Sequence, residues 1–292
     1  MNILLTGHEG YVGVGLFNYL STNHSVTGWG RKQDILSITP EILKKQQITA
    51  VVNCATVMDR ISPNFVLNSE SDRVNIEGMK PLVRAVQELN IPLIHISTKD
   101  VFGDCFSCED VKETPEGFRP KFLVDDNQPF SPQTIYAKTK LISEFITETH
   151  SKSVVIRLSS CYTDFDHHRG NWIVNIIKTL FKGESPRVTN TGRQFRDLLH
   201  VHDLGILIEQ ILESKKYGVK INAGGGVDNI YSILQIIRMI LPSARIAEID
   251  GGDYGFAFNN RLANECYHWH PKILFKERLP LIKKNIQEHI KE

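Results

Sequence analysis

The chain has 292 residues, of which 41% are apolar and 23% are charged, and these proportions are typical of a soluble globular protein with one large domain or two modest ones. Lys and Arg number 34 against 33 acidic residues, so no overall field attracts nucleic acid or an anionic membrane, and we expect neither as a partner. The apolar run at the N-terminus is too short for a signal peptide, and no later run approaches the roughly 18 residues of a spanning helix. We therefore expect a cytoplasmic protein.

The chain contains five cysteines: Cys54, Cys105, Cys108, Cys161 and Cys266. Their odd number and scattered positions argue against a disulfide framework and suit a reducing compartment. Cys105 and Cys108 have the spacing of a metal-ligand pair, but a closed zinc site needs further Cys or His residues nearby. We expect no metal site.

The first half of the chain alternates short β-branched apolar runs with longer segments of helical period, the pattern of a parallel sheet flanked by helices. Strands are predicted at residues 2–5, 25–27, 50–53, 92–96 and 154–158, and helices at 13–21, 40–46, 74–89 and 136–149. Each strand-helix-strand unit should be right-handed. The predicted fold class is α/β, with a doubly wound parallel sheet of the Rossmann type.

The second half of the chain has a looser pattern. Helices are predicted at 172–181, 204–213, 233–241 and 279–291, with one clear strand at 219–222. We expect residues 1–160 to form the Rossmann domain and residues 161–292 a smaller, mostly helical lobe for the substrate, with some segments returning to the first domain.

Two connections are long, at 59–73 and 104–132, and long loops inside a compact domain commonly form binding edges or lids. The 104–128 loop is expected either to cap the substrate or to be an inert excursion.

A glycine-rich segment, Thr6-Gly7-His8-Glu9-Gly10-Tyr11-Val12-Gly13, follows the first predicted strand and opens the first helix. In such a turn Gly7 allows the tight bend, Gly10 lets the backbone approach a pyrophosphate, and Gly13 permits close packing of helix on sheet. We predict that this segment holds a dinucleotide, with contacts from Gly7, Glu9, Gly10, Tyr11, Val12 and Gly13. The alternative is a glycine turn that only joins strand to helix.

The end of the second predicted strand bears on the choice of cofactor. A site that prefers NAD often has an acidic residue there for the ribose 2′-OH, but this strand ends in Arg31 and Lys32. These cations could meet a 2′-phosphate, since arginine offers a planar fork of donors suited to phosphate. We predict NADP as the preferred cofactor, with NAD as the second choice. The alternative is a pair of solvated surface cations.

Tyr136 and Lys140 are four residues apart at the start of a predicted helix, so both side chains emerge on one face. A phenol titrates near pH 10 when unperturbed, and an adjacent ammonium lowers its pKa, so the pair can serve as an acid/base. Thr98 lies at the carboxyl end of a central strand, where ligands bind in doubly wound sheets. It is placed to hydrogen-bond the oxygen whose proton Tyr136 handles.

Further motifs follow in a fixed order: Asn53-Cys54-Ala55, Val74-Asn75-Ile76-Glu77-Gly78, Ser97-Thr98 with Val101-Phe102-Gly103, Arg157-Leu158-Ser159-Ser160, the segment 195–203, and Arg261-Leu262 with Trp269 and Pro271. Over nearly its whole length the chain thereby resembles the extended short-chain dehydrogenase/reductases, specifically the NAD-dependent epimerase/dehydratase family. It looks closest to the dTDP-4-dehydrorhamnose reductase-like branch, which reduces 4-keto nucleotide sugars.

The resemblance implies roles for particular residues. Thr98, Tyr136 and Lys140 would form the catalytic triad, with Lys140 also holding the nicotinamide ribose. Further cofactor contacts would come from Asp34, Ile35, Cys54, Ala55, Thr56, Asn75, Ser97, Leu158 and Ser159. Substrate contacts would come from Thr98, Asp100, Val101, Phe102, Tyr136, Arg196 and Arg261, with the two arginines facing the phosphates; the alternative for Arg196 is a salt bridge with Asp197 or Asp203. Many relatives dimerise through flanking helices, so a homodimer through residues 74–89 and 136–149 is expected.

One departure from the family pattern narrows the chemistry. The 4,6-dehydratases carry Asp-Glu directly after the active-site Thr, whereas this chain has Lys99 and Asp100. Lysine cannot supply the carboxylic acid needed to eliminate water, so dehydration is disfavoured. We therefore predict reduction of a 4-keto-6-deoxy nucleotide sugar by NADPH. A nucleotide-sugar epimerase with bound NAD is the alternative among enzymes, and a dinucleotide-binding sensor or regulatory subunit is the alternative outside them.

Overall fold

A computed structural model describes residues 1–62, 64, 66–167 and 171–291 of the chain. Its centre is a six-stranded sheet in the order β11-β7-β4-β3-β1-β2, with every neighbouring pair parallel. The strands are β1 Asn2–Thr6, β2 Ser25–Trp29, β3 Ala50–Asn53, β4 Leu93–Thr98, β7 Ser153–Leu158 and β11 Val219–Ala223. β3, β4 and β7 are buried along their whole length, as expected of parallel strands covered on both faces.

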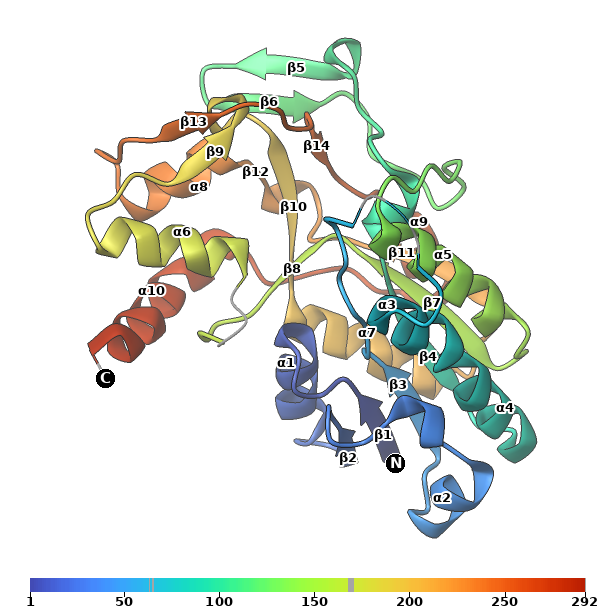
Figure 1. The fold of residues 1–292 in the computed structure, drawn as a ribbon. Helices are drawn as coiled ribbons and strands as arrows, with labels where there is room; N and C mark the ends of the chain where they lie inside the picture. The colour runs from blue at the N-terminus through green and yellow to red at the C-terminus, as the bar shows by residue number, and fades with distance from the viewer. Residues whose placement is uncertain (63, 65, 168–170, 292) are drawn as a thin grey trace.

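Helices cover both faces of this sheet (Figure 1). One layer contains α1 Tyr11–Leu20, α7 Val201–Ser214 and α9 Arg261–Tyr267, and the other contains α2 Pro40–Lys45, α4 Met79–Leu89 and α5 Ile135–Glu148. The short α3 Glu70–Asp72 and a π-helical turn at Arg73–Glu77 precede α4. The predicted doubly wound α/β fold is confirmed. α7 and β11 return to it from the second half of the chain.

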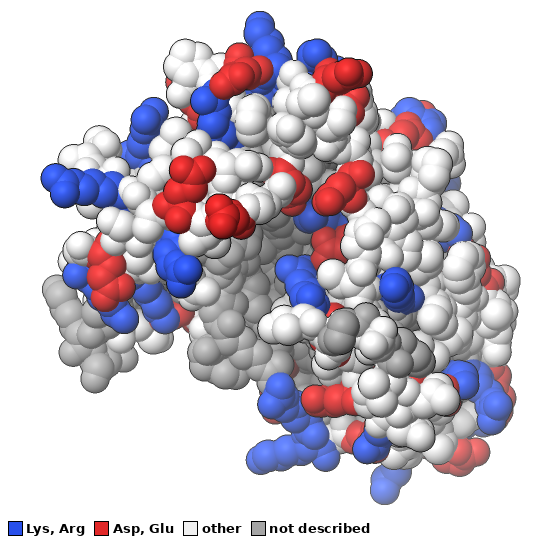
Figure 2. Space-filling view, turned by 45° about the horizontal axis from the view of Figure 1, so that its top comes forward, with Lys and Arg blue, Asp and Glu red and all other residues white. Residues whose placement is uncertain are grey.

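The second lobe holds more strands than the sequence predicted. Its elements are β8 Ser160–Tyr162, α6 Trp172–Phe181, β9 Arg187–Thr189, β10 Phe195–His200, β12 Ile230–Ser232, α8 Ile233–Ile240, β13 Ala247–Ile249, β14 Gly255–Phe256 and α10 Phe275–Lys291. Most of these strands have two or three residues, too few for a period-2 pattern to show in the sequence. Basic and acidic side chains are interspersed over the face shown in Figure 2, in keeping with the near-zero net charge.

The long 104–128 connection contains a hairpin, β5 Val111–Thr114 and β6 Gly117–Pro120, that docks on the second lobe (Figure 1). The amide of Phe118 donates to the Arg193 carbonyl at 2.8 Å, and the Arg193 guanidinium donates to the Thr114 carbonyl at 3.0 Å. The amide of Val124 donates to the Ala257 carbonyl at 2.8 Å. The connection is therefore packed on the second lobe rather than an isolated excursion, and its role as a substrate cap stays a prediction.

A buried ion pair fixes α5 against the sheet. Arg157 on β7 donates from Nη2 to Oε2 of Glu144 on α5 at 2.8 Å, and both side chains are 1% exposed. The Ser97 hydroxyl on β4 donates to Oε1 of the same carboxylate at 2.5 Å. Two neighbouring central strands and the helix therefore share one carboxylate.

Replacing Glu144 by alanine should leave the Arg157 guanidinium buried and unpaired, which costs about 3–5 kcal/mol. We expect urea unfolding to show a loss of that order in the free energy of unfolding. Glu88→Ala is the matched control: Glu88 pairs with Lys44 at 3.6 Å and both are exposed, so the change should stay within about 0.5 kcal/mol. Equal small losses in both variants would contradict this account of α5.

Candidate active site

The glycine-rich turn between β1 and α1 has the shape of a phosphate cradle. Gly7 has a φ of +70°, and its amide donates to the Trp29 carbonyl at the end of β2 at 2.7 Å. A Cβ at Gly13 would lie 2.1 Å from the Gly7 carbonyl oxygen, so only glycine allows this approach. Gly10 precedes α1 and offers no side-chain cap, which leaves the first helical N–H groups for an anion. The turn fits the pyrophosphate of a dinucleotide.

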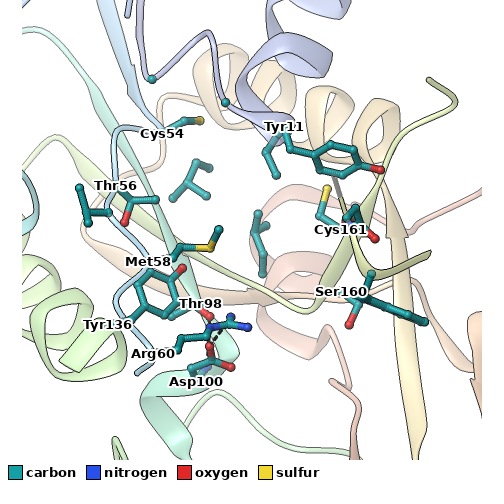
Figure 3. A pocket seen from close by; sticks show the side chains of 18 of the residues that line it. Tyr11, Cys54, Thr56, Met58, Arg60, Thr98, Asp100, Tyr136, Ser160 and Cys161 are labelled. Atoms are coloured by element: carbon teal, nitrogen blue, oxygen red, sulfur yellow. Dashed lines mark hydrogen bonds and ion pairs between the residues drawn. The ribbon is translucent and has the colours of Figure 1, made fainter. Parts of the chain in front are cut away.

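A deep cleft runs from this turn along the carboxyl edge of the sheet to the second lobe. Most of the predicted cofactor residues line it: Gly7, Glu9, Gly10, Tyr11, Val12, Gly13, Arg31, Lys32, Asp34, Ile35, Cys54, Ala55, Thr56, Ser97, Tyr136, Leu158 and Ser159. Figure 3 shows Tyr11 and Cys161 on one side of the cleft and Thr56, Met58 and Tyr136 on the other. One cavity thus joins the predicted cofactor and catalytic residues.

Asn75 does not line the cleft, in contrast to its predicted contact with the cofactor. It is 2% exposed, and its side-chain amide accepts from the Val57 amide at 2.8 Å and donates to the Val57 carbonyl at 2.9 Å. It also donates to the Thr139 hydroxyl on α5 at 2.9 Å. Asn75 therefore fixes the segment after β3 against α5.

Glu9 supplies a carboxylate at the end of β2, where the sequence showed only cations. Its Oε2 accepts from the Arg31 amide at 3.0 Å, and a Cβ at Gly30 would come within 2.3–2.5 Å of its carboxyl group. The glycine at position 30 makes room for this carboxylate. Sequence reasoning placed Glu9 in the phosphate cradle and did not foresee this contact, because it joins residues from two different turns.

Tyr136 lies in the first turn of α5 and is 7% exposed, with its ring in the cleft beside Thr98 (Figure 3). Burial raises the pKa of its phenol to about 12, and the Asp100 carboxylate acts in the same direction. The Arg60 guanidinium and a hydrogen bond with Thr98 oppose this rise in the pKa. The phenol is therefore protonated at neutral pH in the structure.

Lys140 is buried at the floor of the site and does not line the cleft. Its Nζ donates to the Ile96 carbonyl at 2.6 Å and lies 3.1 Å from Nε2 of His95. Burial lowers the pKa of Lys140 to about 8. The sequence predicted that this ammonium would lower the pKa of Tyr136; in the structure Arg60 is the cation beside that ring.

His95 belongs to a buried chain of hydrogen bonds under the cofactor end of the cleft. Its Nδ1 faces the side-chain nitrogen of Asn53 at 3.0 Å, and its Nε2 faces the Ser143 hydroxyl at 2.8 Å. The Asn53 oxygen already accepts from the Ala55 amide at 3.2 Å, so we assign the proton of His95 to Nε2. Burial lowers the pKa of His95 well below its ordinary value, and Lys140 acts in the same direction. The imidazole is therefore neutral.

The predicted substrate residues divide into two groups. Thr98, Asp100, Tyr136 and Arg196 line the cleft. Val101 and Phe102 are 0% and 1% exposed and belong to an apolar core with Phe256 and Phe258. The expectation that these two side chains touch substrate is corrected, since they are packed beneath the strand end.

The two predicted phosphate-binding arginines are both held in ion pairs. Arg196 donates from Nη1 to Asp253 at 2.9 Å, so its partner is Asp253 rather than Asp197 or Asp203. Arg261 lies outside the cleft and pairs with Asp125 and Glu265. The predicted contact of Arg261 with the substrate phosphates is therefore corrected.

Arg60 was missed by the sequence analysis. Its guanidinium carbon lies 5.3 Å from the centroid of the Tyr136 ring, and its Nη2 donates to Asp100 Oδ2 at 2.7 Å (Figure 3). The other oxygen of Asp100 lies 3.0 Å from Nζ of Lys99. The only available signal was the length of the connection after β3, which indicated a binding edge without naming a residue.

Two kinds of feature are absent from the part of the chain that the structure describes. Within the described part of the chain no helix is long and apolar enough to cross a membrane. Nor do His, Cys, Asp and Glu side chains gather there in a group of three that could hold a metal.

The fold and the site together define a doubly wound α/β protein with a glycine-rich turn that fits a dinucleotide and a tyrosine at the carboxyl edge of its sheet. A model of the NAD dependent epimerase/dehydratase family matches residues 3–224, so the chain belongs to that family.

Known proteins of two kinds resemble this chain. The dTDP-glucose 4,6-dehydratase of Mycobacterium tuberculosis is 23% identical over 304 residues, which cover 93% of this chain and 88% of that protein. The structure of UDP-glucuronic acid 4-epimerase from Bacillus cereus, in complex with UDP-glucuronic acid and NAD, has a TM-score of 0.82 at 21% identity and covers 99% of this chain and 100% of that one. The dTDP-glucose 4,6-dehydratase of Bacillus anthracis, in complex with NAD, has a TM-score of 0.80 at 19% identity, with 100% and 97% covered.

These likenesses confirm the predicted family and fold. They do not support the predicted reductase-like branch, because the relatives named above are dehydratases and an epimerase. The two structures of relatives hold NAD, so the predicted preference for NADP is not supported either.

The buried ammonium of Lys140 should cost stability at neutral pH. Because its pKa in the folded protein, about 8, lies below the ordinary lysine value of about 10.4, the unfolded chain binds more protons between these values and stability rises with pH through that window. Lys140→Met should remove most of this slope and raise the free energy of unfolding at about pH 7 by on the order of 1–3 kcal/mol.

Urea unfolding at about pH 7 and about pH 9 measures both effects. Lys138→Met is the matched control, because Lys138 is exposed on the same helix; it should change neither the stability nor its slope. If the Lys140→Met protein is less stable than the parent at both pH values, the hydrogen bond that Lys140 makes with the Ile96 carbonyl outweighs the cost of burying its charge.

Proposed function

We propose that the protein is an NAD-dependent enzyme that oxidises and re-reduces an alcohol carbon of a nucleotide-linked sugar, in the manner of an epimerase. The observation that carries this proposal is the position of Tyr136 and Thr98, side by side in a cleft that continues to the glycine-rich turn. The family and the named relatives support the substrate class, since the dehydratases and the epimerase act on nucleotide sugars by their names.

The residues divide the work as follows. Bound NAD supplies the hydride acceptor. In its phenolate form, Tyr136 takes the proton of the sugar hydroxyl as the carbonyl forms, and it returns the proton when the carbonyl is reduced. Thr98 orients the oxygen through its hydroxyl. Lys140 is buried with its ammonium on the Ile96 carbonyl, so it would have to turn from that contact to hold the ribose of a bound dinucleotide.

Several relatives are dehydratases by name, but the residues of this site are poorly suited to dehydration. The positions after Thr98 hold Lys99 and Asp100, so the acid that would protonate a leaving hydroxyl is missing. Lys99 and Arg60 also hold the pKa of Asp100 below its usual value against the effect of burial, which makes it a weak base. These features favour an enzyme that oxidises the sugar to a ketone and then reduces the ketone, without eliminating water.

Net reduction of a 4-keto sugar is the second candidate function. It rests on the same missing acid and on Arg31 and Lys32 at the cofactor end of the cleft. Its support is weaker because the Glu9 carboxylate lies against the backbone of Gly30 and Arg31, where a 2′-phosphate would meet a like charge. We therefore propose NAD as the cofactor.

Removing the charge of Glu9 should shift the balance between the two cofactors. In Glu9→Gln we expect the ratio of the NADPH to the NADH dissociation constant to fall by about tenfold, because a repulsion between like charges is lost. Fluorescence titration measures both constants. Glu70→Gln, which changes an acidic residue elsewhere along the cleft, should leave the ratio alone. An unchanged ratio in Glu9→Gln would remove Glu9 from cofactor selection.

The reaction itself is tested by incubating the protein with UDP- and dTDP-linked hexoses and uronic acids and with their 4-keto derivatives. Nuclear magnetic resonance of the products, together with NADH absorbance, separates the outcomes. An epimer without net change in NADH supports the proposal, stoichiometric NADH consumption indicates a reductase, and a 4-keto-6-deoxy product indicates a dehydratase. Tyr136→Phe should lower turnover by about 10²–10⁴-fold with little change in NAD affinity; a fully active variant would contradict the role of the phenol.

A further inference from the structure

The loop after β3 is fastened to the start of α5 at the tyrosine itself. The amide of Tyr136 donates to the Asp59 carbonyl at 2.8 Å. The Asp59 carboxylate accepts from the amides of Ile61 at 3.2 Å and Ser62 at 2.9 Å, which turns the chain sharply around Arg60. Asn75 holds Val57 on the other side of Arg60. The backbone of Arg60 is therefore fixed relative to the phenol.

The side chain of Arg60 is held over the phenol by an ion pair. Its guanidinium lies 5.3 Å from the ring centroid, and its Nη2 is 2.7 Å from Oδ2 of Asp100. Lys99, 3.0 Å from Oδ1, occupies the other side of the carboxylate and lies over the Phe256 ring. Asp100 is 17% exposed at its side chain and Arg60 56%, so the pair lies at the boundary between the cleft and the solvent.

Four charged groups lie on the elements that pack around Tyr136. Arg60 comes from the loop after β3, Lys99 and Asp100 from the turn after β4, and Lys140 from α5 itself. The ammonium of Lys140 is turned to the Ile96 carbonyl below the ring. Arg60 and Asp100 are the two charges that act on the proton affinity of the phenol, and they act in opposite directions.

We propose that Arg60 and Asp100 form a charge pair that tunes proton transfer by Tyr136, with Arg60 favouring the phenolate and Asp100 opposing it. Arg60 acts through the tyrosine and is a positioning residue. The inference deepens the proposed function and rests on it, because tuning matters only where Tyr136 exchanges a proton. A cation over an aromatic face in a partly desolvated site has the sign and the proximity that this role needs.

The consequence for the reaction is specific. In the oxidising half, the O–H bond of the sugar would break and its proton would pass to the phenolate as the carbonyl forms, with bound NAD supplying the acceptor for the hydride from the carbon. The phenolate must exist for the proton to move. Arg60 raises the fraction of phenolate. The negative charge of Asp100, which is paired with Arg60, limits that increase.

The test compares variants of opposite expected sign. Arg60→Gln should raise the apparent pKa of the rising limb in the pH profile of kcat by about one unit, a tenfold loss of phenolate at neutral pH, and Asp100→Asn should lower it by a similar amount. Arg60→Lys should restore most of the parent value. Lys80→Gln is the control, because Lys80 on α4 pairs with Glu77 of the preceding turn outside the cleft; it should not move the limb.

A second measurement keeps the inference separate from the proposed function. Phenolate absorbance of each variant with NAD bound, minus that of the same variant carrying Tyr136→Phe, is recorded at one alkaline pH at which circular dichroism shows every protein folded. The expected order of phenolate content is Asp100→Asn above the parent and the parent above Arg60→Gln. If that order is found without turnover of any nucleotide sugar, the charge pair stands and the proposed reaction fails. Equal phenolate contents, or shifts of the same sign in both variants, overturn the charge pair.

Discussion

The buried contact between Arg157, Glu144 and Ser97 is the constraint on which the site depends. It ties α5 to β4 and β7, with two charged side chains almost fully removed from water. Such a pair adds little net stability compared with apolar packing, but it is costly to break, so it acts as a device that fixes position. Tyr136 lies two turns before Glu144 on the same helix, and Thr98 directly follows Ser97 on the same strand. The distance between phenol and hydroxyl is therefore set by a salt bridge below the cleft.

The buried ammonium of Lys140 is held in a state that costs energy at neutral pH. The Lys140 ammonium and the Tyr136 phenol are both buried, and burial shifts the pKa of each away from its ordinary value in the direction of its neutral form. A dinucleotide lying over the glycine-rich turn would change that environment by covering the cleft and by adding hydroxyl groups near the lysine. The energetic cost of the buried ammonium is offset by the apolar cores on both sides of the sheet.

The sequence predicted the sheet well and the site only in part. β1, β3, β4 and β7 were found within one residue at most ends, because buried parallel strands are continuous apolar runs bounded by turns. The glycine-rich turn and the Tyr-x-x-x-Lys pair were readable because each is local. The contact of Glu9 with Arg31 and that of Arg60 with Tyr136 join distant segments, so no spacing rule could indicate them. Val101 and Phe102 were misplaced for a related reason: the turn after β4 directs Asp100 to the cleft and its next two neighbours into the core. The homodimer and the domain boundary at residue 160 stay predictions.

The residues after Thr98 connect the reaction class to the acid/base chemistry. Lys99 replaces the acid that a dehydratase needs, and it also pairs with Asp100, which in turn holds Arg60 over the phenol. One local change in sequence therefore has two physical effects: it removes the group that would protonate a leaving hydroxyl, and it places a net positive charge beside the tyrosine. Under the proposed function, such a site lacks an acid for eliminating water and has electrostatic support for removing a hydroxyl proton. Both effects favour a reaction in which the sugar is oxidised and then reduced with all its oxygens in place.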